Sequence, residues 1–448
     1  MFRVMTLRCL AIILCLVPLL AAAPARAGND DELFVGNQAA MLGGAVSATV
    51  SDSSATWYNP AGLGATERDQ VDVSATVYTL RLYHSPIFIQ SADGARTSGG
   101  VSELVVAPAQ VAFVRRLRPG LSLGVGYFVP RSTNYALREE LAAGSASQES
   151  QWQVAVAVAD TQHIGALALG YALAPNVRLG ASLYGGYGSS SNAFMLYGSR
   201  ARAGEPNAVS SANLIGTTTR ISLELGLGLQ VDITDRLRVG VSARSPQLLL
   251  YSGTDLMSNR VTGAVGGAVA GELATQARHP QTSQGLDLWR SGRAGLALAY
   301  RYGAGHVSLE IDVQPPLRRS SLELRRETLV NARVGLYHAL SSAFALGFGL
   351  FTDRASQAVS WQVVSVRGDF YGATFGVEYN NQHLLAAGER ANTLEFNGVL
   401  ALRYAYSASD FSTLVVDAAK LPGMPFGAAK GELNVHELGL YVGSGLRF

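Results

Sequence analysis

The sequence has almost no cysteine. Only Cys9 and Cys15 occur in 448 residues, and both lie within residues 1–27. That segment has early arginines, an apolar run and an A-x-A cleavage site ending at Ala27, which together predict a secretory signal peptide. Cys15 lies inside the apolar run, which argues against a lipoprotein cysteine. We therefore expect a mature chain without thiols, and this excludes disulfides, cysteine metal sites and cysteine nucleophiles.

Long apolar runs and charged residues are also scarce. After residue 27 no run approaches the roughly 20 apolar residues of a membrane helix, although 48% of the residues are hydrophobic. Only 15% are charged, and the formal net charge of +2 gives no basic footprint for nucleic acid. The chain instead has 49 glycines and 18 tyrosines, with no composition break. This composition in a secreted chain is typical of a membrane β-barrel.

Catalytic and metal-binding motifs are missing from the sequence. The seven histidines, among them His84, His163, His306 and His436, lie far apart, and no H-E-x-x-H, G-x-S-x-G or P-loop motif occurs. A Ser-His-acid group assembled in space stays open at this stage. We expect no enzyme activity, no cofactor and no metal site.

Alternation with a period of two residues dominates from residue 70 onward. In the segment 221–233 every odd-numbered residue is Ile, Leu or Val, and the even-numbered ones are Ser, Glu, Gly, Gln and Asp. A continuous apolar face must be buried or must face lipid. The other face predicts a wet lumen because it combines charges with glycines. A soluble sandwich would also alternate, with its polar face in water.

Strand pairs with short polar turns recur along the chain, and longer polar connections such as 188–216 and 252–292 separate them. Short turns at one end and long loops at the other are the layout of an outer-membrane barrel. We count about fourteen predicted strands, which agrees with the even number of strands in such barrels. The predicted hairpins are 105–117 with 121–135, 164–173 with 177–187, 219–233 with 237–251, 293–302 with 306–314 and 329–340 with 343–352; four further strands are 71–83, 370–380, 393–406 and 435–448.

The stretch 43–63 has neither the two-residue period of a strand nor the 3.6-residue period of a helix. It ends in the turn signals Asn59, Pro60, Ala61 and Gly62. Its GGA, SDSSA and WYNPAGL segments resemble the N-terminal hatch of the FadL-type outer-membrane transporters. The resemblance implies that Asn59, Pro60 and Ala61 form a turn that blocks the inside of a barrel. An ordinary surface loop is the alternative reading.

The resulting fold prediction is all-β: a transmembrane antiparallel β-barrel of about 14 strands whose lumen is plugged by an N-terminal hatch. The predicted domains are the signal peptide at 1–27, the hatch at 28–68 and the barrel at 69–448. The last strand also resembles those of bacterial outer-membrane barrels, because the chain ends on the aromatic Phe448 at the end of a largely apolar face.

Two prolines lie inside predicted strands, where proline removes a ladder donor. The turn at residues 118–120 places Pro108 opposite or nearly opposite Pro130. Gly124 and Gly126 remove side-chain bulk from the lumen face beside them. The segment 121–130 resembles the third strand of the FadL family, whose inward kink opens the wall sideways to lipid. The resemblance implies an opening here; alternatively, the prolines only shape a rim above the hydrocarbon zone.

Several ionisable residues fall on the predicted lumen face, and an arginine among them could hold a ligand carboxylate through its planar fork. Arg244, Arg333 and Arg403 are the candidates for ligand binding. The alternative is that such residues pair with one another or anchor the plug. The loop 261–274 is apolar and could form a landing groove, a small helix or a mobile segment. The full set of lumen-facing ionisable residues is Glu224, Arg238, Arg244, Glu310, Asp312, Arg333, Glu395 and Arg403.

The resemblance implies a passive transporter of the bacterial outer membrane that takes up long-chain fatty acids or aromatic hydrocarbons, by lateral diffusion through a gap in the wall. The expected partners are the hydrophobic ligand, outer-membrane lipid and lipopolysaccharide, and a monomer is expected. Two alternatives stay open: a barrel scaffold of a secretion or surface-assembly system, and a barrel lipase or protease.

Overall fold

The computed structural model describes residues 33–145, 148–265, 273–319, 324–355, 366–385, 392–421 and 426–448. The predicted signal peptide lies outside these ranges. So do residues 28–32 of the predicted hatch and residues 266–272 of the apolar loop.

Helices are few and short in the described ranges. They are α2 (Asn37–Met41), α3 (Ala55–Tyr58), η1 (Pro60–Ala65) and η3 (Ala418–Lys420). None of these helices combines the length and apolar character needed to cross a lipid bilayer.

Strands make up most of the chain, and a single sheet holds 17 of them. The strands are β1 (Gln70–Ser91), β2 (Arg96–Arg118), β3 (Leu121–Ser145), β4 (Gln148–Ala174), β5 (Val177–Arg202), β6 (Asn207–Asp232), β7 (Leu237–Arg244), β8 (Gln247–Val265), β9 (Leu273–Arg290), β10 (Arg293–Tyr302), β11 (Gly305–Gln314), β12 (Leu317–Arg319), β13 (Leu324–Arg326), β14 (Leu329–Ala339), β15 (Phe344–Asp353), β16 (Val366–Arg367), β17 (Phe370–Leu385), β18 (Asn392–Val416) and β19 (Phe426–Arg447). β12 and β13 form a separate small sheet.

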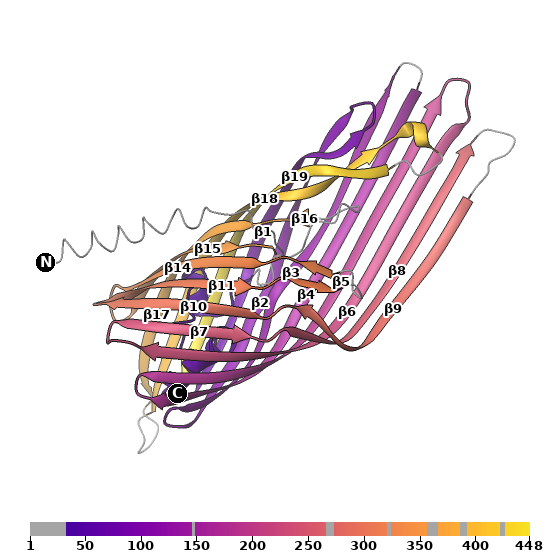
Figure 1. Cartoon of the computed structure of the whole chain (residues 1–448). Helices are drawn as coiled ribbons and strands as arrows, with labels where there is room; N and C mark the ends of the chain where they lie inside the picture. The colour runs from indigo at the N-terminus through magenta and orange to yellow at the C-terminus, as the bar shows by residue number, and fades with distance from the viewer. Residues whose placement is uncertain are drawn as a thin grey trace.

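The large sheet closes into a barrel (Figure 1). Consecutive strands pair antiparallel around the ring, and β19 pairs with β1 from Arg447–Gln70 to Asn434–His84. β7 and β8 pair with successive stretches of β6, and β10 and β9 continue each other in the same way, so each pair is one interrupted strand. If β7 with β8 is counted as one strand, β9 with β10 as another, and the two-residue β16 is left out, the ring in the described ranges has fourteen strands. This count confirms the predicted barrel.

The outer surface of the barrel is apolar. In β6 the predicted apolar face points outward: Leu225 is 56% and Leu227 is 63% exposed, whereas Gly226, Gly228 and Gln230 on the alternate positions are buried. Exposed Leu, Val, Phe and Tyr residues recur on the same outward positions around the ring. A closed wall with this surface is stable against lipid, because most of its backbone groups pair within the wall.

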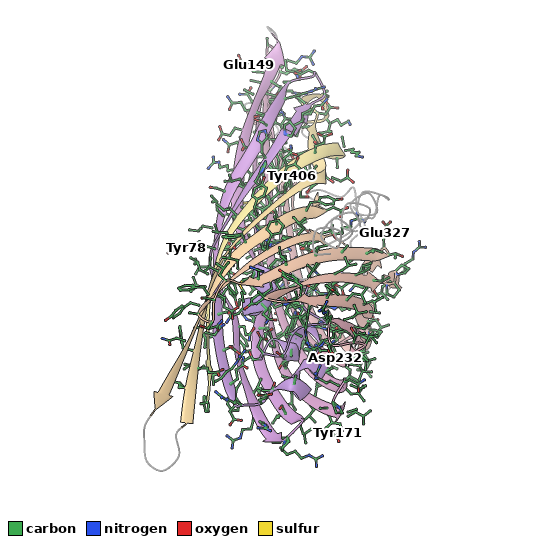
Figure 2. All side chains as sticks on the ribbon, turned by 90° about the vertical axis from the view of Figure 1, so that its left-hand side faces the viewer. Tyr78, Glu149, Tyr171, Asp232, Glu327 and Tyr406 are labelled. Carbon is green, nitrogen blue, oxygen red and sulfur yellow. The ribbon has the colours of Figure 1, made fainter. Side chains whose placement is uncertain are left out.

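The long polar connections 188–216 and 252–292 were wrongly predicted as loops. β4 has 27 residues and β5 and β6 have 26 each, well beyond the 9–11 that span a bilayer. Glu149 and Tyr171 of β4 lie near opposite ends of the molecule (Figure 2). The polar residues Ser, Thr and Asn of these extensions pair as strands because they complete a ladder that the apolar part below has already started. The apolar segment 261–265 likewise belongs to β8.

One departure from the antiparallel pattern lies at the loop end of β1. Residues 89–91 pair parallel with 414–416 of β18, although β19 separates the two strands lower down. Phe88 and Ile89 are buried there, in an apolar cluster with residues of β3–β6 and β15–β19. The end of β1 therefore bends into the lumen, and the upper lumen has apolar walls.

Outward-facing Leu225 gives a test of this placement. Leu225→Arg should lower the free energy of unfolding by roughly 2–4 kcal/mol if the residue lies near the bilayer midplane. Met195→Arg is the matched control: Met195 is also exposed, but it lies on the polar extension of β5, so a change within about 0.5 kcal/mol is expected there. Guanidinium unfolding of vesicle-inserted protein measures both. Equal costs at the two positions would contradict the assigned membrane zone.

Candidate functional site: a filled lumen and an unpaired seam

The N-terminal segment 33–66 lies inside the ring, at the end with the short turns (Figure 1). α2 contacts β15, β17, β18 and β19, whereas η1 contacts β3 to β6 on the opposite wall. Met41, Leu42 and Leu63 of this segment are fully buried, in one apolar cluster with wall residues such as Val114 and Val399. The segment thus spans the lumen and packs against both walls.

Asn59 connects this segment to the wall. It ends α3 and caps η1, where its Oδ1 accepts from the Ala61 N–H at 3.2 Å and Pro60 starts the helix. Its Nδ2 donates to the carbonyl oxygens of Ser47 at 2.8 Å, Leu229 at 3.1 Å and Val241 at 3.4 Å. The side chain is fully buried. One amide therefore fixes the turn, the segment and the paired strands β6 and β7.

Glycines on the inner wall let the segment approach the strands closely. A Cβ at Gly180 would lie 2.2 Å from the Pro60 carbonyl carbon, and one at Gly228 would lie 2.1 Å from Asn59 Oδ1. A Cβ at Gly124 would meet Thr56 at 2.4 Å. The prediction of a wet lumen beside these glycines was wrong, because the backbone of the segment occupies that space.

Polar wall residues complete the attachment. Gln230 donates to the carbonyl oxygens of Ser47 at 3.2 Å and Val50 at 3.0 Å. Glu310 accepts from the Val46 N–H at 3.1 Å, and from the N–H and the hydroxyl of Ser47 at 2.9 and 2.8 Å. A buried polar group without partners is costly, so these bonds favour one position of the segment.

The lumen-facing ionisable residues lie in ion pairs or against the segment. Arg244 lies over the Trp57 ring at 4.1 Å and donates to the Trp57 carbonyl, with Glu224 at 3.9 Å. Arg403 pairs with Glu437 and lies over the Phe34 ring at 5.3 Å. The remaining pairs are Arg333 with Glu310 and Asp312, Arg238 with Asp232, and Glu395 with Arg68 and Arg447. The candidates Arg244, Arg333 and Arg403 are therefore engaged in holding the segment and the wall.

Backbone pairing between the consecutive strands β2 and β3 stops partway along their length. Their ladder runs from Arg118–Leu121 to Gln110–Phe128, and no ladder pair of the described residues joins 96–109 to 129–145. On their other sides β2 continues its pairing with β1, and β3 with β4. Continuing the β2–β3 register places Pro108 opposite Pro130, so two residues without an N–H meet where the ladder stops. We call this line above Gln110 and Phe128 the seam.

Gly124 and Gly126 lie below the seam, in the paired part of the hairpin. A Cβ at Gly126 would lie 2.4 Å from the Phe128 ring, and the space at Gly124 is taken by Thr56 and Leu63. These glycines make room for the filling of the lumen, rather than for an inward bend of β3.

Side chains bridge the seam from the inside. Leu33 donates its N–H to the Pro130 carbonyl at 3.0 Å and packs with Val105, Ala107 and Val129. Higher up, Glu103 of β2 accepts from the Asn134 N–H of β3. These residues were not predicted, because Leu33 lies outside the motifs of the sequence and Glu103 precedes the predicted strand 105–117.

Arg81 of β1 also reaches across the seam. It lies 3.6 Å from Glu103 and 2.7 Å from Glu437, and it donates to the Ser132 carbonyl at 3.1 Å and the Thr133 hydroxyl at 3.2 Å. Arg81 and Glu103 are both buried. The seam is therefore closed by the backbone hydrogen bond from Leu33 and by side-chain contacts, and not by a ladder between β2 and β3.

Comparison with known proteins identifies the fold. No protein-family profile and no curated protein matches the sequence. Among solved structures, a FadL homologue from Pseudomonas aeruginosa covers 94% of this chain and 99% of its own at 11% identity, with a TM-score of 0.57. The toluene transporter TodX of P. putida gives the same coverages at 13% identity and 0.58. The CymD monoaromatic hydrocarbon channel covers 93% and 98%, at 12% identity and 0.53. The chain has the fold of these structures over nearly its whole length.

Asn59→Ala tests the attachment of the segment. The change removes the four hydrogen bonds of the amide, and the buried Ser47 carbonyl then depends on Gln230 alone. We expect an intact barrel, with its heat-modifiable mobility on gels, but a higher conductance to small ions in planar bilayers. Asn176→Ala, at an exposed turn, is the control. Unchanged conductance in Asn59→Ala would show that the amide does not hold the lumen closed.

Two glycines of β5 give an independent test. Gly180→Ala places a methyl group against the Pro60 backbone, whereas Gly185→Ala has no atom within 4 Å of the new carbon. We expect Gly180→Ala to displace η1 and expose 60–65 to protease, and Gly185→Ala to behave as wild type. Equal protection of 60–65 in the two variants would contradict the close contact.

Proposed function

We propose that this protein is a bacterial outer-membrane channel for the passive uptake of small hydrophobic molecules. The observation that carries the proposal is the coincidence of a filled lumen with an unpaired line in the wall between the consecutive strands β2 and β3. A solute that follows water would need an open axial pore, and the segment 33–66 occupies that path. A hydrophobic solute can instead pass between strands into lipid. The structural neighbours include a toluene transporter and a monoaromatic hydrocarbon channel, which agrees with such a substrate.

The segment 33–66 acts in this proposal as the hatch, and the Asn59-Pro60-Ala61 turn holds it in place. The domain boundaries follow, with the hatch at 28–68 and the barrel at 69–448. The protein works as a monomer among outer-membrane lipid and lipopolysaccharide, without enzyme activity. The apolar walls of the upper lumen receive the ligand first.

The seam is the proposed exit. Opening it does not break a backbone ladder between β2 and β3, because Pro108 and Pro130 end that ladder. It requires Leu33 to leave Val105, Ala107 and Val129, which links the seam to the start of the hatch. Transfer of the ligand from the lumen into lipid then releases about 0.8 kcal/mol per buried CH₂. A ligand that displaces Leu33 would thus open the seam through which it leaves.

A disulfide across the seam tests the route. Ala109 and Val129 face each other in the continued β2–β3 register, and both are buried. The Ala109→Cys/Val129→Cys variant should take up labelled dodecanoate or toluene at the wild-type rate when reduced, and at least about tenfold more slowly when oxidised. Uptake by cells, normalised to the amount of folded barrel, is the measurement.

A cysteine pair in the paired wall, Leu298→Cys/Leu309→Cys, is the control for oxidation. Pro108→Val/Pro130→Val, which restores two ladder donors, should also slow uptake without a thiol. A wild-type uptake rate in the oxidised Ala109→Cys/Val129→Cys variant would refute lateral exit, but it would not refute the uptake function. No uptake by any form, wild type included, would refute the function itself.

A further inference from the structure

The outer surface of the barrel stays apolar down to the short turns. Leu173 and Ile233 lie directly beside such turns and are more than half exposed, and so is Leu340 at the turn between β14 and β15. The short turns of an outer-membrane barrel lie on the periplasmic side, and its apolar band ends at the head groups of the lipid. The turns therefore lie at the level of the phosphate groups of the inner leaflet.

A β-bulge directs Arg118 toward this lipid. The β2–β3 register shifts by one residue between Arg116 and Arg118, and Arg118 pairs with Leu121. Leu121 is in turn the ladder partner of Tyr171, which is exposed on the outer face at the end of the barrel opposite to Glu149 (Figure 2). Residues directly opposed in antiparallel strands share a face of the sheet. Without the bulge, alternation would place Arg118 on the lumen face.

Arg118 has no carboxylate partner in the described part of the chain. Its side chain is exposed, and its guanidinium lies over the Tyr171 ring at 5.9 Å, a contact that leaves the positive charge in place. Asp69, at the start of β1, accepts from the Arg115 guanidinium at 2.5 Å and from the Arg116 N–H at 2.8 Å. That carboxylate is therefore bound by the two neighbouring arginines and does not neutralise Arg118.

The turn between β6 and β7 adds further positive charge at the same end of the barrel. Three guanidinium groups share the carboxylate of Asp232: those of Arg178 at 3.1 Å, Arg238 at 2.6 Å and Arg301 at 3.9 Å. These four side chains together keep an excess of positive charge. Like Tyr171, Asp232 lies toward the turn end of the molecule (Figure 2). Arginines in excess over acids give this end a positive potential, which attracts anions.

We propose that Arg118 binds the phosphate group of an anionic phospholipid of the inner leaflet, such as phosphatidylglycerol. A planar guanidinium can donate two parallel hydrogen bonds to a phosphate. The acyl chains lie along the outward row that continues from Arg118 through Leu121 and Tyr171 to Leu179. The excess positive charge of this end favours an anionic head group over a zwitterionic one. The bound lipid fixes the depth of the turns in the membrane, and this role is independent of the proposed uptake function.

Lipid competition on the wild-type protein gives the first test. Purified full-length protein in detergent is loaded with radiolabelled phosphatidylglycerol, and scintillation proximity follows its displacement. Unlabelled phosphatidylglycerol should compete at a concentration about fivefold lower than phosphatidylcholine with the same acyl chains, the factor expected from one arginine near an anionic lipid surface. Inorganic phosphate at the same concentration and constant ionic strength should not compete.

Two outcomes of this competition would overturn the proposal. Equal competition by the two lipids would refute a site for an anionic head group. Displacement by inorganic phosphate as effective as that by phosphatidylglycerol would show a site for a free anion only. Either outcome would leave the uptake of hydrophobic molecules untouched, because uptake is measured separately.

Variants at the two ends of β2 locate the site. Arg118→Gln should weaken phosphatidylglycerol binding about fivefold and leave phosphatidylcholine binding unchanged. Arg96→Gln is the matched control, because Arg96 begins the strand that Arg118 ends, and it is likewise exposed. Wild-type binding in Arg118→Gln, or an equal loss in Arg96→Gln, would overturn the assignment. Heat-modifiable mobility verifies folding, and the wild-type competition decides the matter if a variant does not fold.

Discussion

Every backbone N–H and C=O group of a wall in lipid needs a partner within the wall, and this constraint organises the molecule. The chain satisfies it by closing β19 on β1 and by pairing each strand with its neighbours around the ring. The β2–β3 seam is an exception, and proline stands on both of its sides two residues beyond the last ladder pair, Gln110–Phe128. Since proline has no N–H, these two residues near the start of the seam lose little by being unpaired. Leu33, Arg81 and Glu103 then cover it with side-chain contacts.

The hatch depends on a second constraint, which is the size of the inward side chains. Wall glycines bring the strands within van der Waals reach of the hatch backbone, and Asn59, Gln230 and Glu310 satisfy polar groups that this contact buries. The hatch is thus bound firmly at its Asn-Pro-Ala turn. Its first described residue, Leu33, attaches to the seam by one backbone hydrogen bond and an apolar contact. In the proposed function the seam moves while the lumen stays closed.

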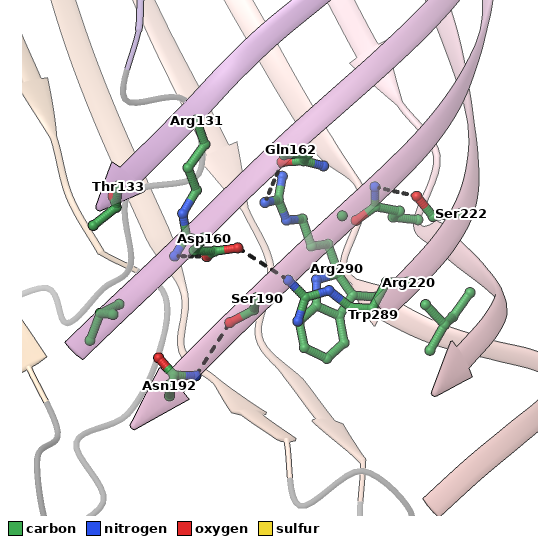
Figure 3. A pocket seen from close by; sticks show the side chains of 14 residues that line it. Arg131, Thr133, Asp160, Gln162, Ser190, Asn192, Arg220, Ser222, Trp289 and Arg290 are labelled. Atoms are coloured by element: carbon green, nitrogen blue, oxygen red, sulfur yellow. Dashed lines mark hydrogen bonds and ion pairs between the residues drawn. The ribbon is translucent and has the colours of Figure 1, made fainter. Parts of the chain in front are cut away.

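The sequence predicted the strand ends at the short turns well, because Pro119-Gly120 and Pro175-Asn176 are unambiguous breakers. The predictions of the opposite strand ends were wrong, because polar extensions such as 188–202 lack the apolar face that marks a strand. The Asn59 turn was predictable from resemblance, but its contacts with β6 and β7 were not, since they depend on how the ring closes. The cavity lined by Arg131, Asp160, Arg220, Trp289 and Arg290 (Figure 3) was not predicted, because the last two residues fall in a predicted loop. The one available signal was Arg220, which lies two residues before Ser222 and so shares the inward face.

A mobile seam differs from a fixed one in the distance between β2 and β3, which can be measured in lipid. Spin labels at Val106 and Ser132, opposite each other in the continued register, span the seam. Labels at Phe113 and Val125, a ladder pair, span the paired part of the same hairpin. Pulsed electron paramagnetic resonance on protein in lipid nanodiscs, with and without dodecanoate, gives both distance distributions. The account predicts a broad distribution across the seam that lengthens with ligand, and a narrow, unchanged one across the paired part. A seam distribution as narrow as that of the ladder pair, and unmoved by ligand, would contradict it.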